Sequence, residues 1–357
     1  METALQEFRD RIADATSRQA PLRIRGGGTK DWYGQALQGE PLDTRKYTGI
    51  VDYEPTELVI TARCGTPLAE IEAALERNQQ MLAFEPPHFG NGATIGGVVS
   101  SGLSGPRRQS AGAVRDFVLG VVLMDGRGEV LHFGGQVMKN VAGYDVSRLL
   151  AGSLGTLGLI TEVSLKVLPQ PVAETTRAFS AKQDEAIRML NEWGGQALPI
   201  SASVWIDDVL AIRLSGAQAA VQSGAQKLGG DPIDGGEDLW RQLREQTHPF
   251  FVGSDGGPLW RLSVPSIAPA LALPGAQMIE WGGAQRWLKS SAEAAAIRAA
   301  VSKVGGHTML FRGGAGESRE HGVFQPLAPA VAKIHRNLKT AFDPAGIFNP
   351  GRMYKDY

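Results

Sequence analysis

The sequence contains a single cysteine, Cys64, among its 357 residues. One cysteine excludes a disulfide framework, a zinc site made of cysteines and an iron–sulfur cluster ligated by cysteines of this chain. We expect Cys64 to be a core thiol at the end of a strand, because it closes the apolar run of residues 55–65, PTELVITARCG.

Net charge and long apolar runs are also scarce. The 36 basic and 37 acidic residues nearly cancel, so the chain lacks the electrostatic footprint of a nucleic-acid-binding protein. The longest apolar runs, such as residues 117–124 (FVLGVVLM), are too short to span a bilayer. The charged first 18 residues lack the apolar core of a signal peptide. We therefore expect a soluble cytoplasmic chain, with attachment to the inner face of a membrane left to a partner.

Closely spaced histidines are absent too. The six histidines show no pair with the spacing of a metal motif. The sequence therefore predicts no metal site.

Glycine, in contrast, is abundant, with 45 residues. It has no fixed period and gathers in three loops, at residues 25–30 (RGGGTK), 86–105 and 152–161. RGGGTK fits neither the P-loop pattern nor the Rossmann G-x-G-x-x-G pattern, because Asp31 stands where either would need another residue. Alone it fits an ordinary turn equally well. Together, the three loops favour one long ligand such as a dinucleotide, held by backbone N–H groups and hydroxyls.

The first half of the chain reads as mixed strands and helices. The pattern predicts a strand at 55–65 and a hairpin over 117–133. The run 136–169 starts like a helix, passes through the third glycine loop and ends in a strand in which Val163, Leu165 and Val167 alternate. A helix is expected over 66–80, with Thr66 as its N-cap.

After Pro169-Gln170-Pro171 the pattern becomes that of an α+β sandwich. Strands are expected near 199–216, 259–265 and 278–288, and helices at 217–228 and 291–304. A last helix over 327–342 places Leu327, Val331, Ile334 and Leu338 on one face. We predict domains at 1–170 and 171–325, with residues 326–357 returning to the first.

The glycine loops carry a family resemblance. RGGGTK, then PPHFGNGATIGG (86–97), RDFVLG (115–120) and GSLGTLGLITE (152–162) resemble the FAD-binding domain of the vanillyl-alcohol-oxidase/p-cresol-methylhydroxylase (PCMH) type. DPAGIFNPGR (343–352) resembles the closing segment of FAD-linked 2-hydroxyacid dehydrogenases. KNVAGYDVSRLLAGSLGTLGLITEVSLKVLP (139–169) is similar to the FAD-binding E subunits of bacterial glycolate oxidases.

The resemblance implies an α+β fold. A PCMH-type FAD-binding domain with two subdomains would be followed by a smaller α/β cap domain with an antiparallel sheet. The C-terminal segment would pack back on the FAD domain.

The resemblance also implies the cofactor, FAD, and the residues that hold it. The first loop would bind the pyrophosphate, the second would continue toward the flavin and the third would wrap the adenosine end; Asp116, in RDFVLG, would be structural. The implied cofactor residues are Arg25, Gly26, Gly27, Gly28, Thr29, Lys30, Pro87, Thr94, Gly96, Gly97, Ser100, Gly102, Gly152, Gly155, Thr156, Gly158, Ile160 and Asn349. Some members of the superfamily attach the flavin through a histidine just after the glycine pair; here Thr29 or Lys30 stands there, so we expect noncovalent FAD.

Catalytic residues are harder to assign. Relatives with their own substrate site pass the hydroxyl proton of a 2-hydroxy acid to a base and hydride to the flavin. His307 is the best candidate base, and Arg261 and Arg312 are candidates for binding the substrate carboxylate; a structural role stays open for each. Lys139 and Asn140 either approach the flavin or begin a solvated helix. The tryptophans of the second domain are expected in its core or in an interface.

The resemblance implies a subunit of glycolate oxidase, oxidising glycolate to glyoxylate. Its partners would be a larger homologous FAD subunit and an iron–sulfur subunit. Two alternatives stay open: an assembly subunit without its own substrate site, and a self-sufficient dehydrogenase for another 2-hydroxy acid such as D-lactate.

Overall fold

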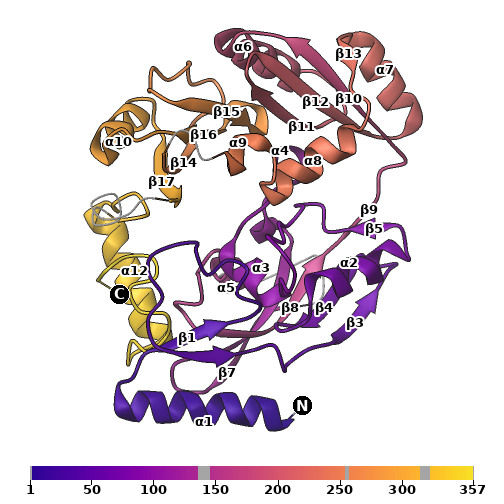
Figure 1. Cartoon of the computed structure of the whole chain (residues 1–357). Helices are drawn as coiled ribbons and strands as arrows, with labels where there is room; N and C mark the ends of the chain where they lie inside the picture. The colour runs from indigo at the N-terminus through magenta and orange to yellow at the C-terminus, as the bar shows by residue number, and fades with distance from the viewer. Residues whose placement is uncertain (1, 136–144, 254–256, 314–321, 357) are drawn as a thin grey trace. The chain divides into compact units, whose positions relative to one another are not determined.

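The computed structural model describes residues 2–135, 145–253, 257–313 and 322–356. The chain forms two compact units (Figure 1). Unit 1 comprises Met1–Leu103, Ala113–Pro169 and Pro326–Tyr357, and unit 2 comprises Ser104–Gly112 and Gln170–Gln325. The short segment Ser104–Gly112 was assigned to the first domain from the sequence, whereas in the structure it belongs to unit 2.

Unit 1 is built on a five-stranded antiparallel sheet with the order β3-β4-β8-β6-β7 and a parallel pair, β1-β2. A third, two-stranded sheet joins β5 and β9. The strands are β1 Leu22–Arg25, β2 Glu40–Asp43, β3 Ile50–Glu54, β4 Val59–Arg63, β5 Gln80–Met81, β6 Val118–Met124, β7 Val130–Gly134, β8 Leu159–Lys166 and β9 Leu168–Pro169. The helices are α1 Glu2–Arg18, α2 Leu68–Glu76, α3 Ile95–Ser101, α5 Val146–Leu149 and α12 Pro329–Phe342, with a 3-10 turn η1 at Val114–Asp116.

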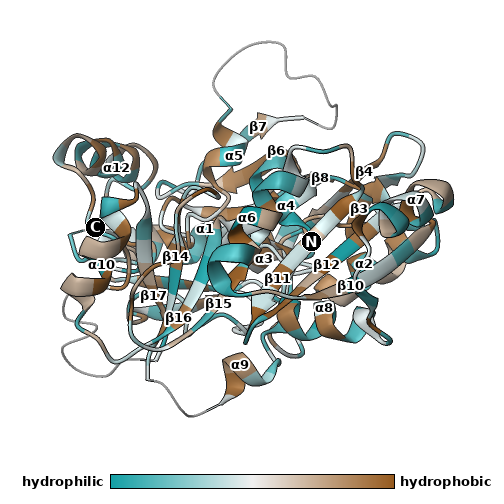
Figure 2. Ribbon diagram, turned by 90° about the horizontal axis from the view of Figure 1, so that it is seen from above, coloured by the Kyte–Doolittle hydropathy of each residue, from teal (hydrophilic) through white to brown (hydrophobic). Residues whose placement is uncertain are grey.

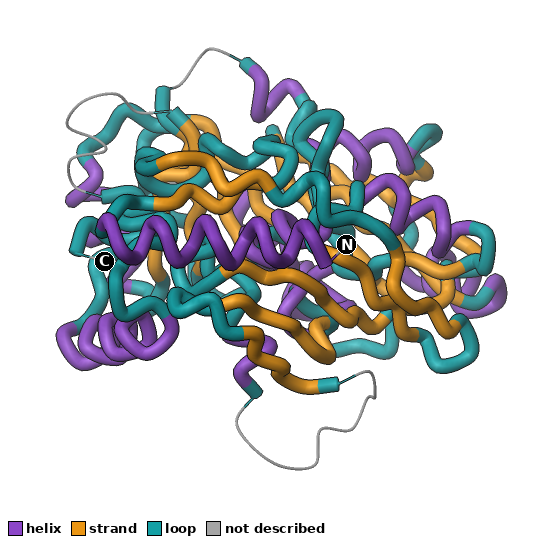
Figure 3. Tube along the Cα trace, turned by 90° about the horizontal axis from the view of Figure 1, so that it is seen from below, coloured by secondary structure: helices purple, strands orange, loops and turns teal. Residues whose placement is uncertain are grey.

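The predicted hairpin over 117–133 is present as β6 and β7, and the strand of 55–65 as β4. The predicted N-cap of the following helix was wrong. The N-cap of α2 is Pro67, whose side chain cannot make a capping hydrogen bond. The Thr66 hydroxyl points to Gly49 instead, where it accepts from the N–H and donates to the C=O. The long helix α1, in the foreground of Figure 3, packs through Phe8 edge-on against Tyr47.

The C-terminal helix α12 differs more from its prediction. The apolar face named from the sequence is not buried along its length, because Val331 and Ile334 are 42% and 57% exposed. Figure 2 shows hydrophobic residues on α12 beside hydrophilic ones. The residue that is buried along this helix is Lys339, so a polar contact rather than an apolar stripe holds it.

Unit 2 contains one antiparallel sheet of eight strands, in the order β13-β10-β12-β11-β15-β16-β14-β17. The strands are β10 Ala173–Ser180, β11 Ile200–Ile206, β12 Val209–Gly216, β13 Asp231–Pro232, β14 Leu259–Ser263, β15 Ala276–Glu280, β16 Gln285–Lys289 and β17 His307–Arg312. The helices are α4 Arg108–Ala111, α6 Gln183–Gly194, α7 Gln218–Leu228, α8 Gly236–Glu245, α9 Pro249–Val252 and α10 Ala294–Lys303, with a 3-10 turn η2 at Trp281–Gly283.

Alternation along the strands separates the two faces of this sheet. One face carries two apolar clusters, one formed with α6 and α7 around Trp205 and Ile279 and one formed with α10 around Trp260 and Leu288. The opposite face is mixed, because it carries Arg261 and Gln285 beside the buried apolar residues Met278 and Trp287. Within the described residues, no helix is long and apolar enough to cross a membrane.

Candidate cofactor site

The first glycine loop leaves β1 in a shape that only glycine can take. A Cβ on Gly27 would lie 1.6 Å from the carbonyl oxygen of Gly92, and one on Gly26 would lie 2.2 Å from Oγ1 of Thr94. Gly28 has a φ of +74°, in the left-handed region. The loop therefore lies directly against the second glycine loop, and no side chain separates them.

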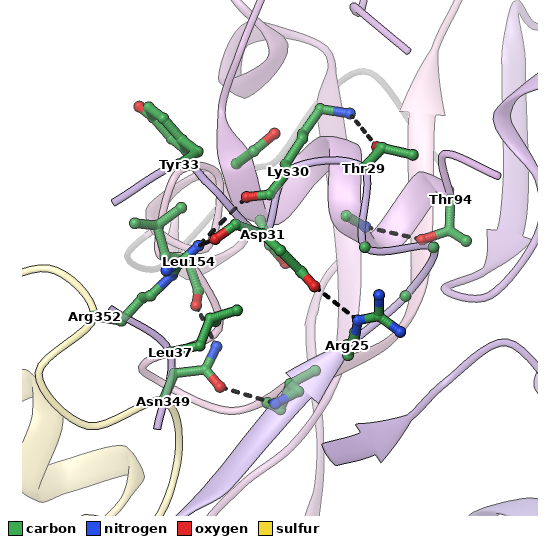
Figure 4. Close-up of a pocket in the computed structure, with 17 residues that line it drawn as sticks. Arg25, Thr29, Lys30, Asp31, Tyr33, Leu37, Thr94, Leu154, Asn349 and Arg352 are labelled. Atoms are coloured by element: carbon green, nitrogen blue, oxygen red, sulfur yellow. Dashed lines mark hydrogen bonds and ion pairs between the residues drawn. The ribbon is translucent and has the colours of Figure 1, made fainter. Parts of the chain in front are cut away.

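The backbone of this loop offers hydrogen-bond donors to a ligand. Across the part of the chain that the structure describes, the N–H groups of Gly26, Gly27, Gly28 and Thr29 donate to no protein acceptor. Buried or half-buried N–H groups rarely stay without a partner, and successive N–H groups in such a turn form an anion-binding concavity. These residues line a cavity together with Arg25, Lys30 and Thr94 (Figure 4).

The second loop enters this cavity through α3. Thr94 is the N-cap of α3, and its Oγ1 accepts a hydrogen bond from the N–H of Gly97. Gly97 and Ser100, one turn later, line the cavity. The hydroxyls of Thr94 and Ser100 and the loop N–H groups thus surround one volume.

The third loop reaches the cavity through Leu154 and is tied there by Asn349. Oδ1 of Asn349 accepts from the N–H of Ile24 at 2.8 Å, and its Nδ2 donates to the carbonyl of Leu154 at 2.6 Å. Asn349 has a φ of +40° and is 6% exposed. One amide side chain near the C-terminus therefore joins the strand before the first loop to the third loop.

Arg352 fixes the other end of the first loop. Its guanidinium donates to the carbonyls of Asp31, at 2.9 Å, and of Gln35. Arg25 forms an ion pair with Asp31 at 2.8 Å. Figure 4 shows Arg25, Asp31 and Arg352 around the cavity. The positively charged guanidinium groups of Arg25 and Arg352 beside the cavity would favour binding of a phosphate group.

An adjoining cavity shares Ile24, Gly26, Ser100 and Asn349 with the first. Its remaining lining includes Thr44, Cys64, Gly96, Gly155, Leu159 and Ile160. Cys64 is 2% exposed, and burial raises the pKa of its thiol to about 12. It is a core thiol, as expected, and not a nucleophile.

Most of the implied cofactor residues line one of these cavities. Those that do are Arg25, Gly26, Gly27, Gly28, Thr29, Lys30, Thr94, Gly96, Gly97, Ser100, Gly155, Ile160 and Asn349. The five that line neither are Pro87, Gly102, Gly152, Thr156 and Gly158.

Three of these five, Gly102, Gly152 and Thr156, make contacts within or between the loops. A Cβ on Gly102 would lie 2.8 Å from Cα of Gly152, so these two glycines let the second and third loops touch. The N–H groups of Gly152 and Leu154 donate to carbonyls of α3 at 2.9 and 2.8 Å. The hydroxyl of Thr156 donates a hydrogen bond to the carbonyl of Ser153 and so closes a turn within the third loop. The sequence pattern alone does not distinguish glycines that approach a ligand from glycines that pack two loops together.

A buried lysine completes the frame of the site. Nζ of Lys339 donates to the carbonyls of Thr156 and Phe348 and pairs with Asp343 at 2.7 Å. Burial lowers the pKa of Lys339, while Asp343 acts in the opposite direction. Neither Lys339 nor Arg352 is among the site residues predicted from the sequence. For Arg352 a signal existed, because it ends the DPAGIFNPGR segment.

The candidate catalytic residues lie on unit 2. Ser263 pairs with His307 and Arg261 with Met309 in the β14–β17 ladder, so Arg261 and His307 share the sheet face opposite the apolar clusters. Nε of Arg261 donates to Gln285 at 2.7 Å. Partial burial, and then the positive charge of Arg261, lower the pKa of His307, which favours a neutral imidazole at pH 7.

Arg312 lies at the other end of β17 from His307. It ends β17 opposite Leu259 and its guanidinium lies over the ring of Phe311. Burial lowers its pKa to about 10.

The four tryptophans Trp205, Trp260, Trp281 and Trp287 are all buried, as expected. Lys139 and Asn140 lie outside the described residues, and within those residues no group of three or more possible ligands could hold a metal ion.

Known proteins match this chain along its whole length. Residues 3–134 match the family model described as an FAD binding domain. The glycolate oxidase subunit GlcE of Escherichia coli (strain K12) is 49% identical over 351 residues, which cover 98% of this chain and 97% of that protein.

More distant relatives match only part of this chain. A D-lactate dehydrogenase of Archaeoglobus fulgidus is 32% identical over 52% of this chain and 42% of its own length. The glycolate oxidase subunit GlcD of Bacillus subtilis is 31% identical over 44% of this chain and 34% of its own length. Among solved structures, alkyldihydroxyacetonephosphate synthase matches with a TM-score of 0.65 at 16% identity over 97% of this chain and 74% of that one, a likeness of fold.

Proposed function

Because the chain belongs to the family of the glycolate oxidase subunit GlcE, we propose that it is the FAD-binding subunit of a multisubunit glycolate oxidase. The observation that carries the proposal is the convergence of three glycine loops on one pair of adjoining cavities in unit 1. FAD is the cofactor that the family model and the relatives support. The enzyme would oxidise glycolate to glyoxylate.

The residues present fit FAD. The N–H groups of Gly26 to Thr29 would donate to the pyrophosphate, with Arg25 and Lys30 adding positive charge beside it. The hydroxyls of Thr94 and Ser100 would donate to the same ligand. The adjoining cavity, with Leu159 and Ile160, is less polar and would receive an apolar part of the cofactor. No histidine stands at the first loop, so the flavin would be held noncovalently.

Bound FAD supplies the acceptor for the two electrons released when an alcohol becomes a carbonyl. The chain's own residues would handle the substrate's charge and proton. Arg261 would pair with the carboxylate of glycolate, with Arg312 as the second candidate. Neutral His307 would accept the hydroxyl proton, which requires the unprotonated ring that its lowered pKa favours.

Electrons must then leave the chain through partners. Its only cysteine is buried with a pKa of about 12, so it offers no thiolate for an iron–sulfur cluster. We propose an iron–sulfur subunit and a larger homologous FAD subunit in the same complex. The match of GlcD to part of this chain supports a homologous partner.

The first test is a visible absorption spectrum of the purified chain, before and after glycolate, with and without the partner subunits. We expect a flavin spectrum that bleaches with glycolate in the complex, and flavin released into the supernatant by acid. Bleaching by D-lactate alone would favour a self-sufficient D-lactate dehydrogenase. Flavin that is never reduced in the turning-over complex would favour an assembly role. No flavin at all would refute the proposal.

The substrate assignment has its own test. Arg261→Gln in the intact complex should raise the KM for glycolate by roughly 10- to 100-fold, the value of one charge-assisted hydrogen bond. Arg188→Gln, at a side chain that is 58% exposed, is the control. An unchanged KM for Arg261→Gln would mean that Arg261 does not bind the substrate carboxylate, and Arg312 would then be the candidate for that role.

A further inference from the structure

One short segment that interrupts unit 1 in the sequence belongs to unit 2. Ser104–Gly112 begins two residues after Gly102, the C-cap of α3, and ends where Ala113 returns to unit 1. α3 supplies Gly97 and Ser100 to the cofactor cavity. A helix of the cofactor site is therefore followed directly along the chain by a segment that folds with unit 2.

These contacts centre on the turn between β15 and β16. Trp281 is 6% exposed, and its Nε1 donates to the carbonyl of Gly105 at 3.2 Å. The guanidinium of Arg108 lies 4.2 Å from the centroid of the Trp281 ring, and that of Arg261 lies 5.1 Å from it. Cations at these distances from an indole are attracted by it.

The same turn is bonded to the segment a second time. The N–H of Gly282 donates to Oγ of Ser203 at 2.9 Å, and this hydroxyl donates to Oε1 of Gln109 at 2.5 Å. Around this centre, Arg107 pairs with Glu174, and Ser110 donates to the carbonyl of Ser201.

The turn is held in an unusual backbone conformation. Trp281, Gly282 and Gly283 have φ values of +52°, +64° and +100°. A bulky residue with positive φ is a costly exception, and such strain concentrates at functional positions. The conformation brings the Trp281 ring and the Gly282 N–H to the same short segment.

We propose that Trp281 is a positioning residue for the cofactor site, acting through Gly105 and the segment Ser104–Gly112 on the end of α3. It touches neither cofactor nor substrate. By fixing the segment that follows Gly102, it holds Gly97 and Ser100 in place for FAD. The inference rests on FAD binding by this chain, as in the proposed function.

The test compares two tryptophans of unit 2 that make the same kind of bond. Trp281→Phe removes the N–H that donates to Gly105 and keeps an aromatic ring between the two arginines. Trp205→Phe is the matched control, because Trp205 is 7% exposed and its Nε1 donates to the carbonyl of Ala181 at 2.8 Å, away from the segment. The measurements are the Kd for FAD by flavin fluorescence, the visible circular dichroism of bound flavin and the thermal midpoint.

Both variants should lose similar thermal stability. Trp281→Phe alone should weaken FAD binding by about five-fold, the value of one neutral hydrogen bond, and change the flavin dichroism. Equal Kd values for the two variants, raised or not, would overturn the positioning role. A wild-type chain that binds no FAD would instead refute the proposed function.

A second variant keeps the test decisive if Trp281→Phe does not fold. Ser203→Ala removes the acceptor for Gly282 and the donor to Gln109 without touching the ring. It should weaken FAD binding in the same direction. A Ser203→Ala protein that folds and binds FAD as the wild type does would count against the proposal.

Discussion

The two candidate regions of this molecule are built from different material. The cofactor region of unit 1 is made mostly of backbone: glycines whose N–H groups face a cavity and whose missing side chains let loops touch. The candidate substrate region of unit 2, on the sheet face that carries Arg261 and His307, uses long side chains that hold one another, such as Arg261 on Gln285. We expect the cofactor region to tolerate almost no substitution of its glycines, because any side chain would displace backbone. In the region of unit 2, each substitution should remove one side-chain contact and reduce function by a limited amount.

The largest effect is expected from adding one methyl group to the first loop. Gly27→Ala places a Cβ 1.6 Å from the carbonyl oxygen of Gly92, and backbone cannot move aside cheaply. We expect FAD binding to be lost and stability to fall by roughly 1–3 kcal/mol, measured by flavin content and urea unfolding. Gly194→Ala, where a Cβ would meet nothing, is the control and should leave both unchanged.

The next effect is expected from Asn349→Ala, which leaves the N–H of Ile24 and the carbonyl of Leu154 without their partner. One buried and one half-buried backbone group left unpaired should cost roughly 2–4 kcal/mol together. Asn349→Asp, which keeps an acceptor for Ile24, should recover part of that stability and less of the FAD affinity. Urea unfolding and flavin fluorescence would show this, and full FAD affinity in Asn349→Ala would contradict the bridging role.

Unit 2 offers a smaller effect that depends on pH. Burial acts to raise the pKa of Glu174, but Ser215 and Arg107 outweigh it, so its pKa lies below the ordinary 4.5. A lowered carboxyl pKa adds stability that is complete above the unfolded value and is lost as pH falls through the folded one. Glu174→Gln should therefore be less stable than wild type at pH 7, by about 1–2 kcal/mol.

The same two proteins should converge in stability as the pH falls below about 4.5, since wild type alone titrates this group. Thermal midpoints from pH 7 down to pH 3 would show it. A constant difference across that range would mean that Glu174 does not stabilise through its charge.

The smallest effect is expected on α12, although the sequence pattern argues otherwise. Ile334→Ser should change stability by less than about 0.5 kcal/mol, because Ile334 is 57% exposed. Lys339→Met on the same helix should cost several times more, since it leaves Asp343 buried without its ion pair. Urea unfolding of both variants decides which face holds the helix.

Sequence analysis succeeded where local pattern decides the structure. Strand alternation placed β4, β6 and β7, and the glycine loops indicated the residues that now line the cavities. It failed where a polar side chain makes a long-range bond that has no period. Thr66 bonds to Gly49 rather than capping α2, and Lys339 anchors α12 from the side that looks polar. Nothing in the run SGPRRQSAG indicates that residues 104–112 fold with unit 2, since those contacts join positions up to 176 residues apart.

The bonds of Lys339 and Asn349 bear on how the protein is made. Both residues belong to the last part of the chain, yet they bond to Ile24, Leu154 and Thr156. While the ribosome is still translating the middle of the message, the three glycine loops already exist, but Asn349, which joins the third loop to the strand before the first, does not. We therefore expect cofactor loading to wait until the C-terminal segment has left the ribosome. A chain that stops before residue 339 would carry all three glycine loops without the bonds of Lys339 and Asn349.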